Sequence, residues 1–342
     1  MNRFNHFLGN IDHLLAESQK SEKDTYCHPA LKNLGSISIV LIREVIAPVV
    51  FRNSEPEITD IDLGAEPHVR AVPNKFKYPE RGRGLQILRA FQVGGRQAQN
   101  KTVLFKNQKP SDGFDLNTLV FGDSTNWENR VLPVKAAVNY SDALSVLPKH
   151  LCVDESFHNR AMEDGTLWDA AEKKNSDNLF SRHFVKPGTL LLQVLSTRGQ
   201  LLPRLGLDHL LLSIGVAGSY GGQTSVTGTN IRTHIAGIYG SYFEQSETSP
   251  YRLVQLLPKE HEALKRDVKQ LSAYLHQELT DSNNPQLKGL SSIHAAAMTA
   301  EEALHYQHEL VARFERDHQK LAEEYQQAAP KVARFFDEWF GK

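Results

Sequence analysis

Residues 37–46 read Ile-Ser-Ile-Val-Leu-Ile-Arg-Glu-Val-Ile. β-Branched and other apolar residues dominate this run, which is typical of a strand buried inside a sheet. The apolar character extends to Phe51, and Pro48 is expected to end or bend the strand, because proline cannot donate a ladder hydrogen bond. We therefore predict a buried strand over residues 37–51 as the first element of the core.

The elements that follow alternate in a recognisable order. A long loop over residues 53–78, with three prolines, leads to a helix predicted at 81–92. The later predictions are a Gly-, Gln- and Lys-rich mobile stretch at 94–115, a strand at 131–146, a polar excursion at 148–182, a strand at 184–196, a Leu-rich helix at 199–214 and a strand at 231–244. The order strand, helix, strand, strand, helix, strand is that of a ferredoxin-like (RRM-like) α+β core.

The chain divides into three parts. Residues 1–35 form a polar N-terminal segment, and residues 36–257 form the core, into which the excursion at about 148–182 is inserted. Residues 258–342 are expected to be helical because helical periodicity appears at 259–279, 299–328 and 330–340. Many RNA-recognition modules use this type of core, but the fold alone does not establish a function.

The composition excludes several classes of protein. The net charge is −1, and 40% of residues are hydrophobic, which is ordinary for a globular protein. There is no run of about 18 apolar residues, so no contact with a membrane is expected. The N-terminus lacks an apolar signal core. Two cysteines, Cys27 and Cys152, cannot build a disulfide framework, and a reduced, cytoplasmic location is therefore expected.

The positive charge is concentrated in one stretch. Between Arg70 and Lys109 there are ten Lys or Arg residues and one acid, Glu80. Free N–H groups at the start of the predicted helix, together with Arg81 and Arg83, could form a cradle for phosphate. Such a distribution favours a polyanion held along one groove, although a solvated basic loop is an alternative. Residues 258–342 carry 11 basic and 14 acidic residues, so this region is not expected to share that contact.

A second notable segment is the glycine-rich stretch at 215–230, between the second helix and the fourth strand. It contains small residues, hydroxyls and side-chain amides, which permit close approach of a ligand to backbone N–H groups. It has no Gly-Lys-Ser/Thr sequence and no Gly-x-Gly-x-x-Gly after a strand, so nucleotide hydrolysis is disfavoured. A loop without a ligand is the alternative.

Four motifs in order resemble a known family. Leu119-Val-Phe-Gly-Asp-Ser124, before Tyr140-Ser-Asp-Ala143, is similar to the Phe-Gly…Ser-Asp-Ala pattern of the repeat-associated RNA-binding superfamily. The helix start at 79–89 and the loop at 221–228 resemble its glycine-rich segments. Phe184-Val-Lys-Pro-Gly-Thr189 resembles a strand entry in the backbone (Cas-seven family) subunits of class 1 CRISPR effectors. The resemblance covers residues 36–250 and is closest to the type I-D backbone subunit of the Cascade surveillance complex.

This resemblance implies a structural RNA-binding subunit. Several copies would stack in a helical filament along one CRISPR RNA, with other Cascade subunits and a target nucleic acid as further partners and without a cofactor. The excursion at 148–182 would be a thumb lying over the RNA. Related subunits often have an arginine in the late glycine-rich loop, where this chain has Gln223. The RNA-binding candidates are Arg52, Asn53, Lys75, Lys77, Arg81, Arg83, Arg89, Tyr220, Gly221, Gly222, Gln223, Thr224 and Ser225.

The resemblance also implies an alternative activity. Some related subunits cut RNA with an acid between the first strand and the first helix, where this chain has Asp60 and Asp62. Two carboxylates could bind Mg²⁺ or assist attack by a 2′-hydroxyl, and a metal-dependent endoribonuclease is therefore an alternative. The simpler interpretation is that both are loop acids.

Two further alternatives depend on other features. His150, Cys152 and His158 lie close together in the sequence, but a tetrahedral zinc site needs about four ligands, so no metal is expected. A metabolic ferredoxin-like domain that binds a small phosphorylated ligand is also possible. It would be saturated by a mononucleotide, whereas a subunit that holds a guide would depend on RNA length.

Overall fold

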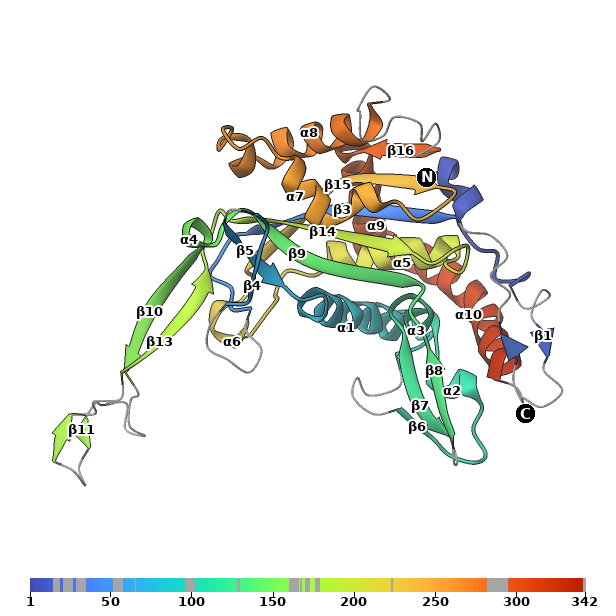
Figure 1. The fold of residues 1–342 in the computed structure, drawn as a ribbon. Coiled ribbons are helices and arrows are strands. Elements are labelled where there is room, and N and C mark those ends of the chain that lie inside the picture. Colours follow the sequence, from blue (N-terminus) through green and yellow to red (C-terminus); the bar gives the residue numbers. More distant parts are fainter. Residues whose placement is uncertain are drawn as a thin grey trace.

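The computed structural model describes residues 1–14, 19–20, 27–28, 35–51, 58–64, 66–95, 102–127, 130–159, 166, 168–169, 173–175, 179–222, 224–281 and 295–340. At its centre is a seven-stranded antiparallel sheet (Figure 1). In spatial order its strands are β16 (Ala296–Thr299), β15 (Ile231–Ser241), β3 (Ser36–Val45), β14 (Leu190–Thr197), β9 (Val138–Pro148), β5 (Pro67–Ala71) and β4 (Asp60–Asp62).

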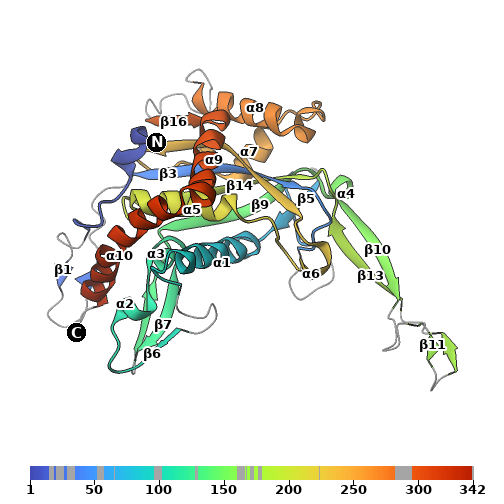
Figure 2. The same ribbon diagram turned by 180° about the vertical axis from the view of Figure 1, so that it is seen from behind.

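Helices cover both faces of this sheet. One face packs against α1 (Asn74–Ala90), α3 (Leu116–Phe121), α5 (Arg204–Gly215), α9 (Ala300–Arg316) and α10 (His318–Phe340). The other face packs against α7 (Pro250–Leu256) and α8 (Val268–Thr280), which Figure 2 shows on the opposite side. Because both faces are covered, every residue of β3 from Ser36 to Arg43 is buried.

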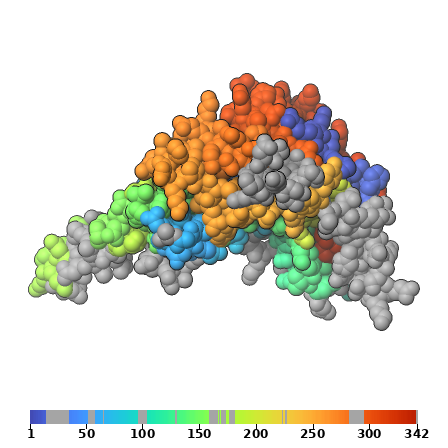
Figure 3. All heavy atoms as spheres, turned by 45° about the horizontal axis from the view of Figure 1, so that its top comes forward, coloured from blue at the N-terminus to red at the C-terminus, as the bar shows by residue number. Residues whose placement is uncertain are grey.

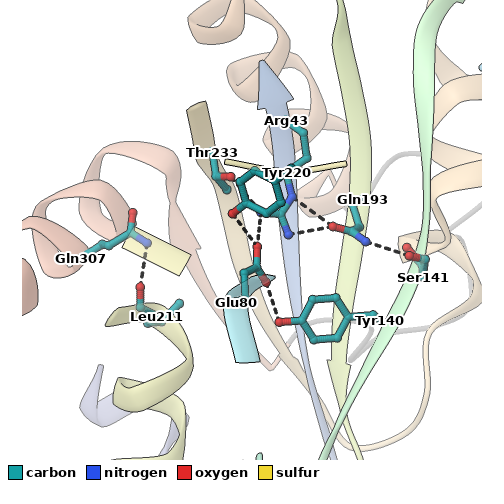
Figure 4. A network of polar contacts seen from close by, with 9 residues as sticks. All are labelled: Arg43, Glu80, Tyr140, Ser141, Gln193, Leu211, Tyr220, Thr233 and Gln307. Atoms are coloured by element: carbon teal, nitrogen blue, oxygen red, sulfur yellow. Dashed lines mark hydrogen bonds and ion pairs between the residues drawn. The ribbon is translucent and has the colours of Figure 1, made fainter. Parts of the chain in front are cut away.

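The α+β class, the antiparallel sheet and the C-terminal helices are confirmed. Four central strands and two helices follow the chain in the order β3, α1, β9, β14, α5 and β15. The C-terminal helices do not form a core of their own, because Leu310, Tyr325 and Phe335 pack in the same cluster as Ile37 and Ile39 of β3. The Gln307 side chain also donates to the carbonyl of Leu211 on α5 at 2.9 Å (Figure 4).

Two sets of strands project from this body. β10 (Val153–Asn159) and β13 (Leu179–Val185) pair antiparallel and form an arm that follows α4 (Lys149–Cys152). The space-filling view shows that the arm stands clear of the body (Figure 3). The second projection is a three-stranded sheet of β6 (Thr102–Leu104), β7 (Asp123–Trp127) and β8 (Arg130–Val134). Both extend from the same side of the large sheet, with α1 between them (Figure 1).

The remaining elements are short. They are η1 (Asn2–Phe7), β1 (Gln19–Lys20), β2 (Cys27–His28), α2 (Pro110–Gly113), β11 (Trp168–Asp169), β12 (Lys174–Asn175), α6 (Thr224–Thr227), η2 (Ser246–Thr248) and η3 (Leu264–Arg266). In the part of the chain that the structure describes, no helix combines the length and apolar character needed to cross a membrane.

The first helix begins seven residues earlier than predicted. α1 starts at Asn74, and Pro79, Gly82 and Gly84 all lie inside it. Pro79 cannot donate to the carbonyl four residues earlier, yet the helix continues because packing on both sides holds it. Gly84 is required by that packing, since a Cβ there would lie 2.1 Å from Oδ1 of Asn117 on α3. The predicted helix start near Arg81 is therefore wrong, and the backbone N–H groups there are not the free N–H groups of a helix start.

Other boundaries also differ. The predicted strand 131–146 is two strands, β8 and β9, in different sheets, and the segment 184–196 is divided between β13 and β14 at Pro187-Gly188. The predicted loop 53–78 contains the edge strand β4 and its neighbour β5. The last helices separate at Asp317 rather than near Pro330, which lies inside α10, because buried side chains on both sides of that proline keep the helix continuous.

Candidate nucleic-acid interface

A buried ion pair fixes α1 against the sheet. Nη1 of Arg43 on β3 lies 2.5 Å from Oε1 of Glu80 on α1, and both side chains are fully buried. Nε and Nη2 of Arg43 donate to Oε1 of Gln193 at 3.0 and 2.7 Å, and Nη1 also donates to Thr233 at 2.8 Å (Figure 4). Burial disfavours the charge on Arg43, but the carboxylate of Glu80 offsets this effect and raises the pKa of Arg43.

Two tyrosines complete the hydrogen bonding of Glu80. Tyr140 of β9 donates to Oε2 at 2.6 Å, and Tyr220 of the glycine-rich loop donates to Oε1 at 3.0 Å. Burial, followed by the charge of Glu80, raises the pKa of both phenols. A carboxylate that is buried without such partners would be strongly destabilising. The network therefore links β3, α1, β9 and the loop that begins at Tyr220.

The glycine-rich loop is closed by a side chain that the sequence did not single out. Asn230 accepts from the N–H of Tyr220 through Oδ1 and donates to its carbonyl through Nδ2, each at 2.9 Å. The N–H of Gly222 then donates to the carbonyl of Val50 at 2.9 Å. Gly221, between them, has φ of +77°, and a Cβ there would lie 2.7 Å from that carbonyl oxygen. The start of the loop is thus fixed beside Val50, in the segment that follows β3.

A groove of about 800 Å³ lies between α1, this loop and the turn after α3. Four predicted residues line it, namely Lys75, Lys77 and Arg81 of α1 and Gly221 of the loop. The other lining residues are Val72, Asn74, Tyr78, Pro79, Phe121, Gly122, Val134 and Ala136. Two segments distant in the sequence, the basic stretch and the glycine-rich loop, therefore meet at one surface.

The cations in this groove have different surroundings. Nη2 of Arg81 pairs with Asp123 at the start of β7, whereas Nε of Arg81 is buried without a hydrogen-bond partner within the described residues. The side-chain ammonium of Lys77, which is partly buried, has no hydrogen-bond or ion-pair partner in the described part of the chain. Burial and, to a smaller degree, the charge of Arg81 lower the pKa of Lys77. An anion entering the groove would offset both effects.

The other candidates lie elsewhere. Arg83 bonds Gln86 on its own helix, and Arg89 bonds the carbonyl of Gly95; neither lines the groove. The side chain of Tyr220 is buried, so the prediction that it faces a surface path is wrong, because the phenol is directed toward Glu80. Gly222, which follows Gly221, and Thr224, at the start of α6, do not line the groove. Arg52, Asn53, Gln223 and the side chain of Ser225 lie outside the described residues.

Asp60 and Asp62 lie at the edge of the large sheet, in β4 rather than in a loop. They alternate with Ile61, so both point to one side of the strand. Asp60 pairs with Lys149 of α4. Neither residue lines the groove beside α1.

The predicted soft ligands are not brought together as a metal site. His150 is exposed, and its Nδ1 lies 4.0 Å from Oε1 of Glu66. Cys152 is buried, and its thiol donates to the carbonyl of Leu147 at 3.4 Å. Burial raises the pKa of the Cys152 thiol. The side chain of His158, on β10, lies outside the described residues. Within those residues, no group of three His, Cys, Asp or Glu side chains could hold a metal ion.

Comparison with known proteins agrees with this fold. The chain is similar to a crystal structure of Csc2 from Thermofilum pendens, with a TM-score of 0.57, 16% sequence identity, and coverage of 100% of this chain and 97% of that one. It also matches a CRISPR RNA-guided surveillance complex, with a TM-score of 0.42, 10% identity, and coverage of 71% of this chain and 85% of that one. For a pre-nicking CRISPR RNA-guided surveillance complex, the TM-score is 0.45 and the sequence identity is 12%, with coverage of 72% of this chain and 89% of that one.

Among the curated proteins compared, none matches this chain. The sequence model of the Csc2 Crispr family, by contrast, matches residues 37–325, which include the large sheet, the groove and most of the C-terminal helices. That match extends over much more than half of the chain, and the chain therefore belongs to the Csc2 family of CRISPR proteins.

Proposed function

We propose that this protein is a backbone subunit of a type I-D CRISPR surveillance complex of the Cascade kind. In this role, copies of the chain line up along one CRISPR RNA in the cytoplasm, next to other Cascade subunits and the target nucleic acid. Each copy holds a short stretch of the guide mostly through its phosphates and does not read the base edges. Such binding tolerates any spacer sequence, which a subunit that holds a guide must do.

The groove beside α1 is the observation that carries this proposal. It combines cations with backbone at a glycine, a pairing that suits phosphate, because both the charges and the N–H groups attract anions. Lys77 supports the same conclusion. Burial disfavours the charge of its ammonium group, and a bound phosphate would offset that effect. We infer that Lys75, Lys77 and Arg81 form the phosphate contact and that Gly221 permits the backbone of the RNA to approach.

The surrounding fold supports the proposal in two ways. The central strand order β15, β3, β14, β9, with α1 and α5 on one face, fits a ferredoxin-like (RRM-like) core. Many proteins that bind single-stranded RNA have a core of this kind. The β10–β13 arm fits a thumb, because it projects on the side where α1 and the groove lie. We propose that the arm of one copy lies over the RNA held by the next copy.

The nuclease alternative receives no comparable support. Asp60 is engaged by Lys149, and both acids lie at the sheet edge rather than beside the proposed RNA path. The proposed contacts need no metal ion or other cofactor.

Binding as a function of RNA length tests the proposal. The affinity of the purified chain should rise from a mononucleotide to single-stranded RNA of several tens of nucleotides, and long RNA should bind several copies. Saturation by a mononucleotide, with no gain for longer RNA, would favour a small phosphorylated ligand instead. The assay is repeated with a chelator present, and binding should persist.

A further inference from the structure

Among the described residues that line the groove, one aromatic ring is exposed. Tyr78 of α1 is 51% exposed and lines the groove together with the three cations. The other exposed large aromatic side chains among the described residues are Phe105, Phe157, Trp168 and Tyr242, and none of them lines this groove. Phe121, which does line it, is only 1% exposed. Tyr78 is thus the aromatic face that a ligand in the groove would meet.

Helical spacing places this ring among the positive charges. Tyr78 follows Lys75 by three residues and precedes Arg81 by three, and residues three or four apart share one face of a helix. Lys77 is adjacent in sequence and lines the same groove. A positive groove that follows the phosphates, with an aromatic ring inside it, is the arrangement by which proteins bind single-stranded nucleic acid without reading its sequence.

We propose that the ring of Tyr78 stacks on a nucleobase of single-stranded RNA held in this groove. This inference rests on the proposed function and adds a base contact to it. Every nucleobase has a flat π-face, so stacking fixes the register of a nucleotide without selecting its identity. Affinity then has two separable parts, a salt-dependent part from Lys75, Lys77 and Arg81 and a part from Tyr78 that depends little on salt.

The test compares Tyr78→Ala, Tyr78→Phe and Tyr242→Ala in the full-length chain. Tyr242 is a matched control, because it is 50% exposed and lies outside the groove. Each variant is titrated with oligo(A) RNA over a range of salt concentrations. Thermal unfolding of each variant is measured as a check on folding. The same titrations are repeated with an RNA in which abasic sugars replace the bases but all phosphates remain.

We expect Tyr78→Ala to weaken binding of oligo(A) about 5- to 100-fold, the range for loss of one stacked base. The slope against salt should not change, and Tyr78→Phe and Tyr242→Ala should bind as the parent does. On abasic RNA, Tyr78→Ala and the parent should bind equally. Unchanged binding of Tyr78→Ala to oligo(A), an altered salt slope, or an equal loss on abasic RNA would each overturn the proposal.

The two proposals fail in different ways. If Lys77→Ala and Arg81→Ala reduce the salt slope while Tyr78→Ala binds oligo(A) like the parent, the groove holds RNA but the stacking inference is wrong. If none of these variants changes the affinity or the slope, the proposed function of the groove fails, and the stacking inference fails with it.

Discussion

Arg43 and Glu80 form an ion pair that is fully buried, with 2.5 Å between Nη1 and Oε1. The pair joins the central strand β3 to α1, the helix that carries the cations of the groove. Glu80 is the one acid between Arg70 and Lys109, and its charge is used inside the protein rather than at the surface. The position of the proposed RNA-binding surface therefore depends on a contact that lies beneath it.

Replacing Glu80 by glutamine should destabilise the protein by about 3–5 kcal/mol, because Arg43 then stays buried without a countercharge. Unfolding in urea gives this value. The matched control is Glu324→Gln, which removes a carboxylate from the surface pair with Arg313 and should cost at most about 1 kcal/mol. A loss at Glu80 no larger than at Glu324 would show that the buried pair does not hold α1 in place.

Lys77→Ala and Arg81→Ala should each weaken binding of single-stranded RNA and make its salt dependence shallower. Each phosphate contact that is lost should reduce the slope by about 0.7 log units of affinity per log unit of salt. Filter binding or fluorescence anisotropy at several salt concentrations measures both quantities.

Arg83→Ala and Lys320→Ala serve as charge controls for that experiment. Arg83 lies on α1 outside the groove, and Lys320 lies exposed on α10. Neither should change the slope. A slope that Arg83→Ala reduces as much as Lys77→Ala would mean that RNA follows a different face of α1.

The affinity for RNA should also fall at alkaline pH through Lys77. Burial and the neighbouring Arg81 lower its pKa below the usual 10.5, so the free protein loses this charge earlier than an exposed lysine does. Binding of a phosphate favours the charged form of Lys77. The affinity is therefore highest below the lowered pKa and decreases as the pH rises through it toward 10.5. The measurement uses a 2′-O-methyl oligo(A), because this RNA is stable at alkaline pH.

Lys77→Arg separates this effect from the titration of other lysines, because arginine keeps its charge throughout the range. The parent should lose affinity between neutral pH and pH of about 10, and the variant should lose less. Identical profiles for the two proteins would exclude Lys77 as the group that titrates in the groove.

The sequence predicted the centre of the fold because its signals are local. The apolar run at 37–51 indicates a buried strand, and β3 is buried as predicted, although it ends at Val45. The start of α1 could not be predicted, since Asn74 follows Pro73 without a side-chain cap, and Pro79 with two glycines is typical of a loop. Only contact with α3 and α5 explains why glycine at position 84 is compatible with a helix there.

The site was predicted in its parts but not in its geometry. The basic stretch and the glycine-rich loop were both identified, but they meet through hydrogen bonds that the sequence does not show. Tyr220 bonds Glu80, which is far away in the sequence, and Asn230 bonds Tyr220 only when the loop closes. Glu80 was noted as the lone acid of the basic stretch but given no role, and Arg43 could have been singled out as a cation inside an apolar run. Val134 and Ala136 gave no local signal, because β7 and β8 bring them to the groove.

His209 should make the stability fall in acid. Burial lowers the pKa of this imidazole from 6.5 to about 3, and the neutral ring contacts Tyr325 at 3.2 Å and Asn117 at 3.1 Å. The unfolded chain takes up a proton below pH 6.5, whereas the folded protein does not until about pH 3. This residue's contribution is therefore complete above pH 6.5 and decreases by up to about 1.4 kcal/mol per pH unit below it.

His209→Gln keeps a hydrogen-bonding side chain that does not titrate in this range. Urea unfolding at pH 7 and pH 5 should show a smaller decrease in stability for this variant than for the parent. The difference between the two decreases isolates this histidine from the other titrating groups. Equal decreases would mean that His209 takes up its proton without unfolding of the α5–α10 contact.

Removal of the arm should separate folding from assembly. The first pair of the hairpin is Val153 with Val185, and the buried side chains of Cys152 and Val185 anchor it to the body. Replacing residues 155–183 by a short Gly-Ser turn leaves that anchor and the groove in place. We expect the variant to unfold at the same temperature as the parent and to bind a short RNA with the same affinity.

On a long RNA the variant should bind without the regular spacing of copies, because the arm no longer reaches the neighbouring copy. Electron microscopy of negatively stained complexes measures the spacing, and sedimentation measures the number of copies. Filaments of the variant with the same spacing and copy number as the parent would contradict a role of the arm in assembly, whereas a loss of binding to short RNA would place the arm in the groove contact itself.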